Sequence, residues 1–164
     1  MGPMKGARPM RTACPGLFAL GVSAIALAGL LTVAAAPASA APVVVSLSLS
    51  KYGSVQNLSA GPSAGVRPEV VHVKVGESVV FVNDDSDHHT ATSLLGASTF
   101  IDDPRWTDDA LHATGSIGGG FWSTGDLAPG QRSAPIVAKQ AGTYLFGCFF
   151  DYGAGMRGEI VVEP

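Results

Sequence analysis

The chain has 164 residues and a formal net charge of −3, and all 13 of its Asp and Glu residues lie after residue 40. Three of the ten Lys and Arg residues lie before that point, so 41–164 carries seven basic and 13 acidic residues, a charge of −6. This acidic balance argues against a nucleic-acid partner and is compatible with a basic protein partner.

The first residues have the pattern of a secretory signal peptide. Three basic residues precede an apolar run over 16–36, and 37–40 supplies a small-residue cleavage site. An uncleaved membrane anchor is the alternative, since the run is about long enough to span a bilayer. The small residues at its end favour cleavage, so we expect 1–40 to be removed. The mature domain, 41–164, is then secreted or extracytoplasmic and not held in a membrane.

Removal of the signal peptide leaves the mature chain with a single cysteine. Cys14 lies before the apolar run, so Cys148 is the single cysteine of the mature chain. No intramolecular disulfide can form, although disulfides are common in exported domains. A lone thiol in an oxidising compartment is buried and inert, paired between chains, or held as a metal thiolate.

Short alternating or β-branched stretches, separated by Gly, Pro, Asn and Asp, predict strands along the whole mature chain. These stretches are 42–50, 70–75, 78–83, 90–93, 121–123, 133–138, 144–148 and 158–162. Seven to eight short strands at this spacing predict an all-β Greek-key sandwich. The connection over 95–120 is long and rich in Asp and Gly, with one helical turn expected at 108–112. A connection of that length is usually a functional or a mobile surface loop.

Residues able to bind a soft metal occur in two places. Near the C-terminus, Cys148 is followed by Asp151 and Met156, and upstream a histidine pair precedes Thr90 in the stretch NDDSDHHT. A thiolate, a thioether and an imidazole are the donors typical of copper electron-transfer sites. Taken singly, Cys148 and Met156 are more often packing residues, so the joint spacing is what favours copper.

Taken together, these motifs resemble those of the cupredoxins, the small blue-copper proteins such as plastocyanin, pseudoazurin and amicyanin. The resemblance is carried by VHVKVGESVVFVNDD, by His89-Thr90, by LAPGQ and by the terminal pattern Tyr144-x3-Cys148-x7-Met156-x-Gly158-x-Ile160-x-Val162. It implies a cupredoxin-like sandwich with one copper ion cycling between Cu(I) and Cu(II). It also implies one-electron exchange with a redox partner protein rather than an enzyme activity.

Ligand roles follow from the resemblance for three residues. His89 would be the first histidine ligand, Cys148 the thiolate and Met156 the long axial ligand. Thr90 stands where the family has a residue that helps to fix the ligand loop. Sulfur donors favour Cu(I) while imidazoles suit both oxidation states, so little rearrangement accompanies electron transfer.

The second histidine of the family pattern is replaced in this chain. It is expected three residues after the cysteine, where this sequence has Asp151. A carboxylate is a harder, anionic donor, which favours Cu(II) and tolerates zinc or another divalent ion. Asp151 is then a substitute ligand, a spectator, or the mark of a site that has lost its metal.

Two other histidines are candidates for the missing ligand. His88 adjoins His89, and neighbours on an extended segment point to opposite faces, so His88 could serve only if the chain bends. His112 lies in the 95–120 connection and could fold over the site. His72 alternates with valines and is expected on a strand surface.

The remaining acidic clusters favour a solvated surface. Asp84, Asp85 and Asp87 are predicted to form a solvated turn rather than a second metal site. A second group has the same interpretation, with a weak calcium site as its alternative; its members are Asp102, Asp103, Asp108 and Asp109.

The sequence is consistent with three functions. The first is one-electron transfer by an exported copper protein, expected to be a monomer, and the second is copper sequestration or delivery without redox cycling. The third is a metal-free β-sandwich used for binding, in which the same residues would be packing. No nucleophile–base–orienter set, phosphate loop or zinc-protease motif supports an enzyme.

Overall fold

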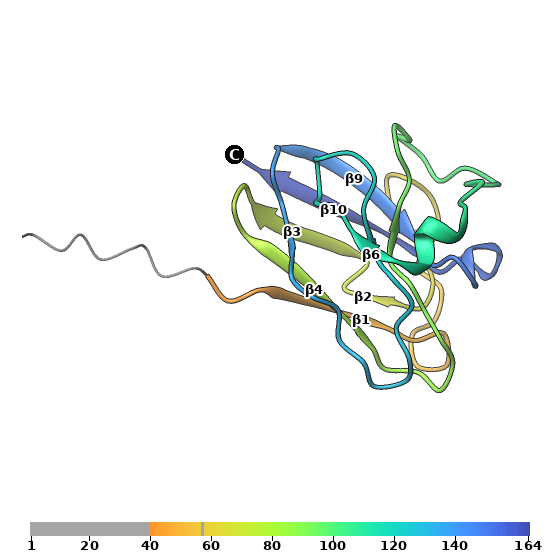
Figure 1. The fold of residues 1–164 in the computed structure, drawn as a ribbon. Coiled ribbons are helices and arrows are strands. Elements are labelled where there is room, and N and C mark those ends of the chain that lie inside the picture. The colour runs from red at the N-terminus through yellow and green to blue at the C-terminus, as the bar shows by residue number, and fades with distance from the viewer. Residues whose placement is uncertain (1–39, 57) are drawn as a thin grey trace, which may run out of the picture. The chain divides into compact units, whose positions relative to one another are not determined.

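The computed structural model describes residues 40–56 and 58–164 (Figure 1). The expected signal peptide, 1–40, lies outside these residues except for its last one. Within the described part, no helix is long and apolar enough to cross a membrane. Its helical elements are two short 3-10 turns, η1 (Asp108–Leu111) and η2 (Tyr152–Ala154).

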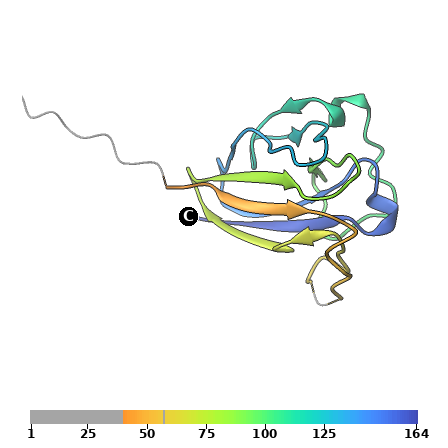
Figure 2. The ribbon, with the colours of Figure 1, turned by 90° about the horizontal axis from the view of Figure 1, so that it is seen from below.

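Two mixed sheets form the domain, and Figure 2 shows the same strands after a quarter turn. The strands of the first sheet are β1 (Val43–Leu47), β2 (Val66–Arg67), β4 (Ser78–Asn83) and β8 (Ile136–Val137). Those of the second are β3 (Val70–Lys74), β5 (Thr92–Ser93), β6 (Ala113–Thr114), β7 (Ser123–Thr124), β9 (Gly142–Gly147) and β10 (Arg157–Glu163). Their orders are β2-β1-β4-β8 and β3-β10-β9-β5-β7-β6.

Connections cross repeatedly from one sheet to the other. The chain leaves the first sheet after β2, returns for β4, and leaves again for β5, so neighbouring strands are often distant in sequence. β1 runs parallel to β4, and β10 runs parallel to β3 while pairing antiparallel with β9. The predicted all-β Greek-key sandwich is confirmed.

Several strand ends differ from the sequence-based prediction for local reasons. The strand predicted over 42–50 ends at Leu47, because Ser48 starts a turn in which its carbonyl accepts the N–H of Tyr52 at 3.1 Å. The strand predicted over 133–138 is reduced to β8, since Pro135 has no N–H to give to a ladder. β2 and β6 were missed because two residues carry too little alternation to recognise.

Apolar side chains from both sheets meet in the larger of two hydrophobic clusters. Phe81 of β4 lies at its centre, with ring centroids 6.0 Å from Trp122 and 5.2 Å from Phe146. All three aromatic side chains are at most 1% exposed. Cys148 and Met156 belong to the same core cluster, so two of the expected metal ligands are buried rather than on the surface.

The 95–120 connection packs onto the domain through several anchors. Its predicted helical turn is confirmed as η1, whose N-cap Thr107 accepts the N–H of Asp109. Trp106 donates its Nε1–H to the carbonyl of Ser93 at 2.9 Å. The Trp106 ring also meets Tyr152 edge to face at 5.4 Å. The connection therefore supports η2, which lies within the loop between β9 and β10 that carries Cys148 and Met156.

Candidate metal centre

The first histidine is fixed through its own backbone, which pairs with that of Leu127. His89 lies between β4 and β5, and it exchanges two backbone hydrogen bonds with Leu127, at 3.1 and 2.9 Å. Its side chain is 1% exposed. This pairing explains why LAPGQ and the histidine pair, which are far apart in sequence, belong to one site.

Cysteine, aspartate and methionine are joined by one tight loop between β9 and β10. The N–H of Cys148 donates to the carbonyl of Met156 at 2.9 Å, and the N–H of Met156 donates to that of Asp151 at 3.2 Å. Gly155 closes the loop with φ of 89°, in the left-handed region that glycine adopts without strain. At the start of the loop, a Cβ on Gly147 would overlap the Tyr152 ring, so this close packing requires glycine.

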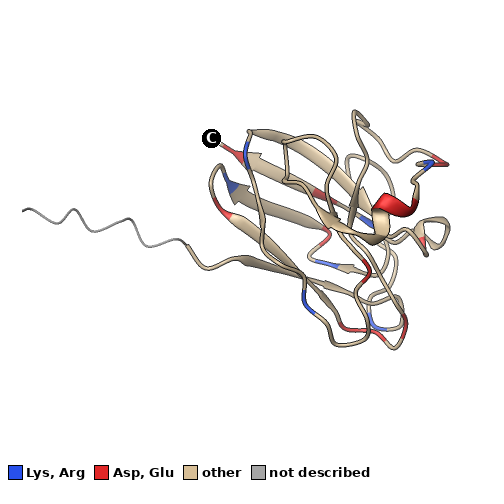
Figure 3. Ribbon diagram, in the orientation of Figure 1, with Lys and Arg blue, Asp and Glu red and all other residues tan. Residues whose placement is uncertain are grey.

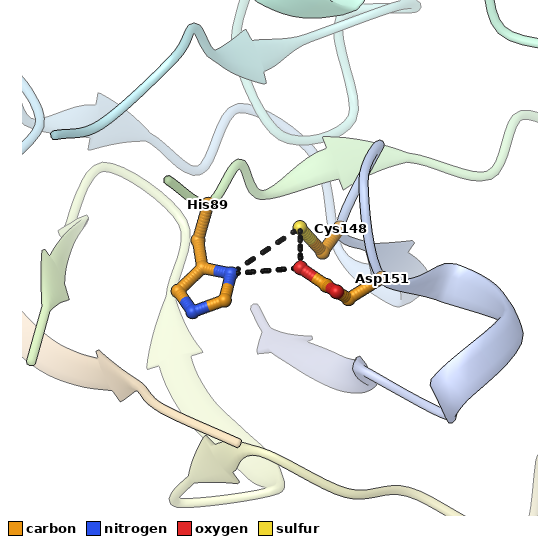
Figure 4. Close-up of side chains that lie close together, drawn as sticks. All are labelled: His89, Cys148 and Asp151. Atoms are coloured by element: carbon orange, nitrogen blue, oxygen red, sulfur yellow. Dashed lines mark hydrogen bonds and ion pairs between the residues drawn. The ribbon is translucent and has the colours of Figure 1, made fainter. Parts of the chain in front are cut away.

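Three donor atoms of different chemistry converge between these segments (Figure 4). His89 Nδ1 lies 3.7 Å from Cys148 Sγ and 3.1 Å from the Asp151 carboxylate, and the sulfur lies 3.6 Å from that carboxylate. Three ligands at about 2.0–2.3 Å from one ion lie about 3.4–3.8 Å apart. The spacing therefore fits a single metal ion bound by a nitrogen, a sulfur and an oxygen.

Thr90 fixes the cysteine from the histidine side. Its N–H points at Cys148 Sγ at 3.4 Å, and its hydroxyl accepts the N–H of Phe149 at 2.9 Å. Thr90 is 1% exposed, so both bonds are shielded from water. The threonine thus connects the two halves of the site, in agreement with the loop-fixing role that the family resemblance implied.

In the metal-free protein, the pKa of the Cys148 thiol lies well above its ordinary value. Burial raises the pKa of Cys148 to about 11, although backbone N–H groups pointing at the sulfur oppose the shift and the Asp151 charge adds to it. A metal ion must therefore displace a tightly held proton. The same thiol, 1% exposed, is poorly suited to act as a free nucleophile.

The stability of the metal-free protein should depend on this thiol at high pH. Because its folded-state pKa of about 11 exceeds the ordinary value of 9.0, the folded state binds the proton more tightly. The resulting stabilisation is complete below about pH 9 and is lost as pH rises towards 11, by about 2–3 kcal/mol. We expect the free energy of unfolding, measured in denaturant, to fall by that amount relative to Cys148→Ala. If the difference in free energy of unfolding between the wild type and Cys148→Ala does not change with pH, the expectation is contradicted.

Asp85 corrects the prediction that the NDDSD stretch is only a solvated turn. Its side chain is 5% exposed, and its carboxylate lies 3.3 Å from His89 Nε2, the ring nitrogen that faces away from the three donors. Asp84, by contrast, forms an exposed ion pair with Lys51 at 2.7 Å. Sequence reasoning missed Asp85, although its position four residues before His89 was a usable signal.

The hydrogen bonds to Asp85 keep its carboxylate ionised. Burial by itself would raise the pKa of Asp85, but the donors Ser50, Ser86 and His89 outweigh burial and hold it far below its usual range. A fixed negative charge therefore lies beside the histidine.

The other histidines do not join the donor set. His88 points to the surface and pairs with Asp126 at 2.8 Å, so the chain does not bend to bring it inward. His72 is exposed on β3, as predicted, and lies 3.6 Å from Glu163. His112 is the exposed C-cap residue of η1. Across 40–56 and 58–164, the single group of three His, Cys, Asp or Glu donors within reach of one ion is His89, Cys148 and Asp151.

The acidic connection forms no comparable group in the described chain. Figure 3 shows η1 coloured red by its aspartates. Asp109 accepts a hydrogen bond from Thr107, while Asp103 lies 3.7 Å from Arg105 and is 73% exposed. These residues have the solvated arrangement that was expected of them.

Met156 is buried, and its backbone is bound to that of Cys148 and Asp151. Its side chain is fully buried, and the two hydrogen bonds described above tie it to Cys148 and Asp151. A Cβ on Gly65 would lie 3.2 Å from the Met156 methyl group. The core thus surrounds the end of the thioether side chain, and axial ligation remains a prediction.

Comparison with known proteins yields structural matches alone. No family model matches the sequence, and neither does any curated protein. Solved structures similar to this chain include a copper(I) form of an amicyanin mutant at pH 4, with 20% identity, a TM-score of 0.47 and coverage of 77% of this chain and 87% of that one. A purple cupredoxin from Nitrosopumilus maritimus has 19% identity and a TM-score of 0.46, with coverage of 74% and 99%. Likeness at this level says nothing about function, so the site has to be judged from its own residues.

Proposed function

We propose that this protein is an exported copper protein of the cupredoxin type that transfers single electrons to or from a partner protein. One ion would be held by His89, Cys148 and Asp151, with Met156 as the axial ligand. The convergence of an imidazole, a thiol and a carboxylate within 3.1–3.7 Å of one another carries the proposal.

The chemistry of the donors supports copper among the possible ions. Thiolate and thioether ligands favour soft ions, Cu(I) among them, and imidazole suits copper in both oxidation states. Bound copper would supply a one-electron couple between Cu(I) and Cu(II). The protein's part is to hold the donors still: backbone pairing fixes His89, and the hydrogen bonds of Thr90 fix Cys148. Small movement on a change of charge is what fast electron transfer needs.

Contact with a partner would be made through the loop that follows the cysteine. His89 and Cys148 are each 1% exposed, whereas the side chain of Asp151 is 30% exposed and Phe150 is 47% exposed. The loop therefore presents a carboxylate and an aromatic ring to the outside. With the acidic charge of the mature chain, this favours a partner with a basic surface around an apolar patch.

Copper holding without redox cycling is the second candidate, and the two carboxylates favour it. Asp151 reaches the donor set directly, and Asp85 adds a second negative charge behind His89. Anionic oxygen donors stabilise Cu(II) and also tolerate zinc. Voltammetry separates the candidates: reversible one-electron cycling supports transfer, whereas a bound ion with slow or absent cycling supports holding.

The test is a copper titration of the mature protein, 41–164, purified without added metal. We expect one equivalent of Cu(II) to bind and to produce strong thiolate-to-copper absorption in the visible, with zinc competing weakly. Elemental analysis of the purified protein supplies the stoichiometry. If neither ion binds, the metal proposal fails and the metal-free β-sandwich becomes the better description. Copper binding without the visible band would show that the Cys148 thiolate is not a ligand.

A further inference from the structure

We propose that Asp85 is a positioning residue for the metal centre, which directs Nδ1 of His89 towards the ion and favours Cu(II) over Cu(I). The inference rests on the proposed function, because it assigns His89 as a ligand. Asp85 itself contacts neither the cysteine nor the other donors; it acts through the far side of the imidazole ring, where its carboxylate lies 3.3 Å from Nε2.

Four hydrogen bonds keep this carboxylate in place. One oxygen accepts the Ser50 hydroxyl at 2.8 Å and the Ser86 N–H at 2.9 Å, and the other accepts the Ser50 N–H at 3.2 Å besides facing His89. The Asp85 side chain itself is 5% exposed, although Ser50 and Ser86 lie at the surface. The carboxylate cannot turn away from the histidine without losing several donors.

Asn83 holds the loop that carries the aspartate. Its amide oxygen accepts the Asp85 N–H at 3.0 Å, and its NH₂ group donates to the carbonyls of Asp87 and Leu127 at 2.6 and 2.7 Å. Asn83 is fully buried at the end of β4. The same asparagine therefore connects the Asp85 loop to the segment that pairs with His89. This connection fixes the separation between the Asp85 carboxylate and the His89 ring.

This arrangement has two physical effects on the histidine. A carboxylate at Nε2 accepts a hydrogen bond from the proton there, which leaves the lone pair of Nδ1 for an ion; without an ion, the Asp151 carboxylate 3.1 Å from Nδ1 competes for that proton. The partly anionic ring is also a stronger donor, and a buried negative charge nearby stabilises the more highly charged ion. Both effects favour Cu(II).

The first test compares Asp85→Asn with Asp87→Asn. Asparagine keeps the size and an acceptor oxygen but removes the charge, while Asp87 is exposed in the same loop and serves as the matched control. We expect Asp85→Asn to lower the ratio of Cu(II) to Cu(I) affinity about tenfold, or about 59 mV in reduction potential for one electron. Asp87→Asn should change it far less. Equal shifts in the two variants would overturn the inference, since they would report only general charge.

The second test needs no copper and so separates this inference from the proposed function. Nitrogen-15 NMR of the metal-free protein should show a slowly exchanging proton on His89 Nε2 that Asp85→Ala abolishes and Asp87→Asn preserves. An unprotonated Nε2, or a proton that survives in Asp85→Ala, would overturn the positioning role. If copper fails to bind but the proton behaves as expected, the proposed function fails while the Asp85–His89 pairing holds.

Discussion

Replacing Cys148 by serine is expected to lower the affinity for Cu(II) about a thousandfold, or about 4 kcal/mol, and to remove the visible thiolate band. A serine hydroxyl does not ionise near neutral pH and is a weak ligand for copper, so the site loses its soft donor. The remaining imidazole and carboxylate, 3.1 Å apart, would bind the ion only loosely. Isothermal titration calorimetry and visible absorption measure the two effects.

A matched variant separates lost ligation from lost packing. Ala138→Ser also places a hydroxyl in the same core cluster but removes no donor, and it should retain both affinity and absorption. Circular dichroism of the metal-free variants checks that each one folds. Tight copper binding by a folded Cys148→Ser protein would show that the thiolate is no ligand, and the proposed centre would be wrong.

Replacing Asp151 by histidine is expected to have the second-largest effect, a positive shift of the reduction potential by about 120 mV. The shift corresponds to about a hundredfold change in the ratio of Cu(I) to Cu(II) affinity. A neutral imidazole removes the anionic oxygen that favours Cu(II), and the visible band should strengthen. Since 30% of the Asp151 side chain is exposed, the larger ring can extend outward without entering the core.

Asp151→Asn is the control for charge alone. It keeps an oxygen of similar reach, so it should raise the potential by less than Asp151→His does. If the wild type and Asp151→His bind both ions alike and have the same spectrum, Asp151 is a spectator. If copper binds only to Asp151→His, the natural site has lost its metal. These outcomes distinguish the three roles that the sequence left open for Asp151: substitute ligand, spectator, or mark of a site without metal.

The sequence predicted the strands well where burial imposes a pattern over several residues. Strong alternation of valines identified β3, and a longer β-branched and aromatic stretch identified β4 with its observed ends. Two of the two-residue strands, β2 and β6, were missed because a β-ladder that short depends on its neighbours. β2, for example, forms as the partner of β1, through the pairing of Val66 with Leu47.

The sequence by itself determined which donors the chain possesses. Spacing within the terminal loop was enough to place Cys148, Asp151 and Met156 close together, because a loop of seven intervening residues cannot separate them far. It also indicated His89 through the neighbouring Thr90. Local chain connectivity is the physical reason these predictions were possible.

Only the tertiary structure decided which groups surround those donors. The ladder between His89 and Leu127 turns one histidine inward and leaves His88 on the surface beside Asp126. The same packing buries Asp85 against the imidazole, although its neighbour Asp84 remains solvated. Adjacent residues of one type thus acquire opposite roles, because burial and long-range hydrogen bonds depend on segments that meet only after the two sheets have packed.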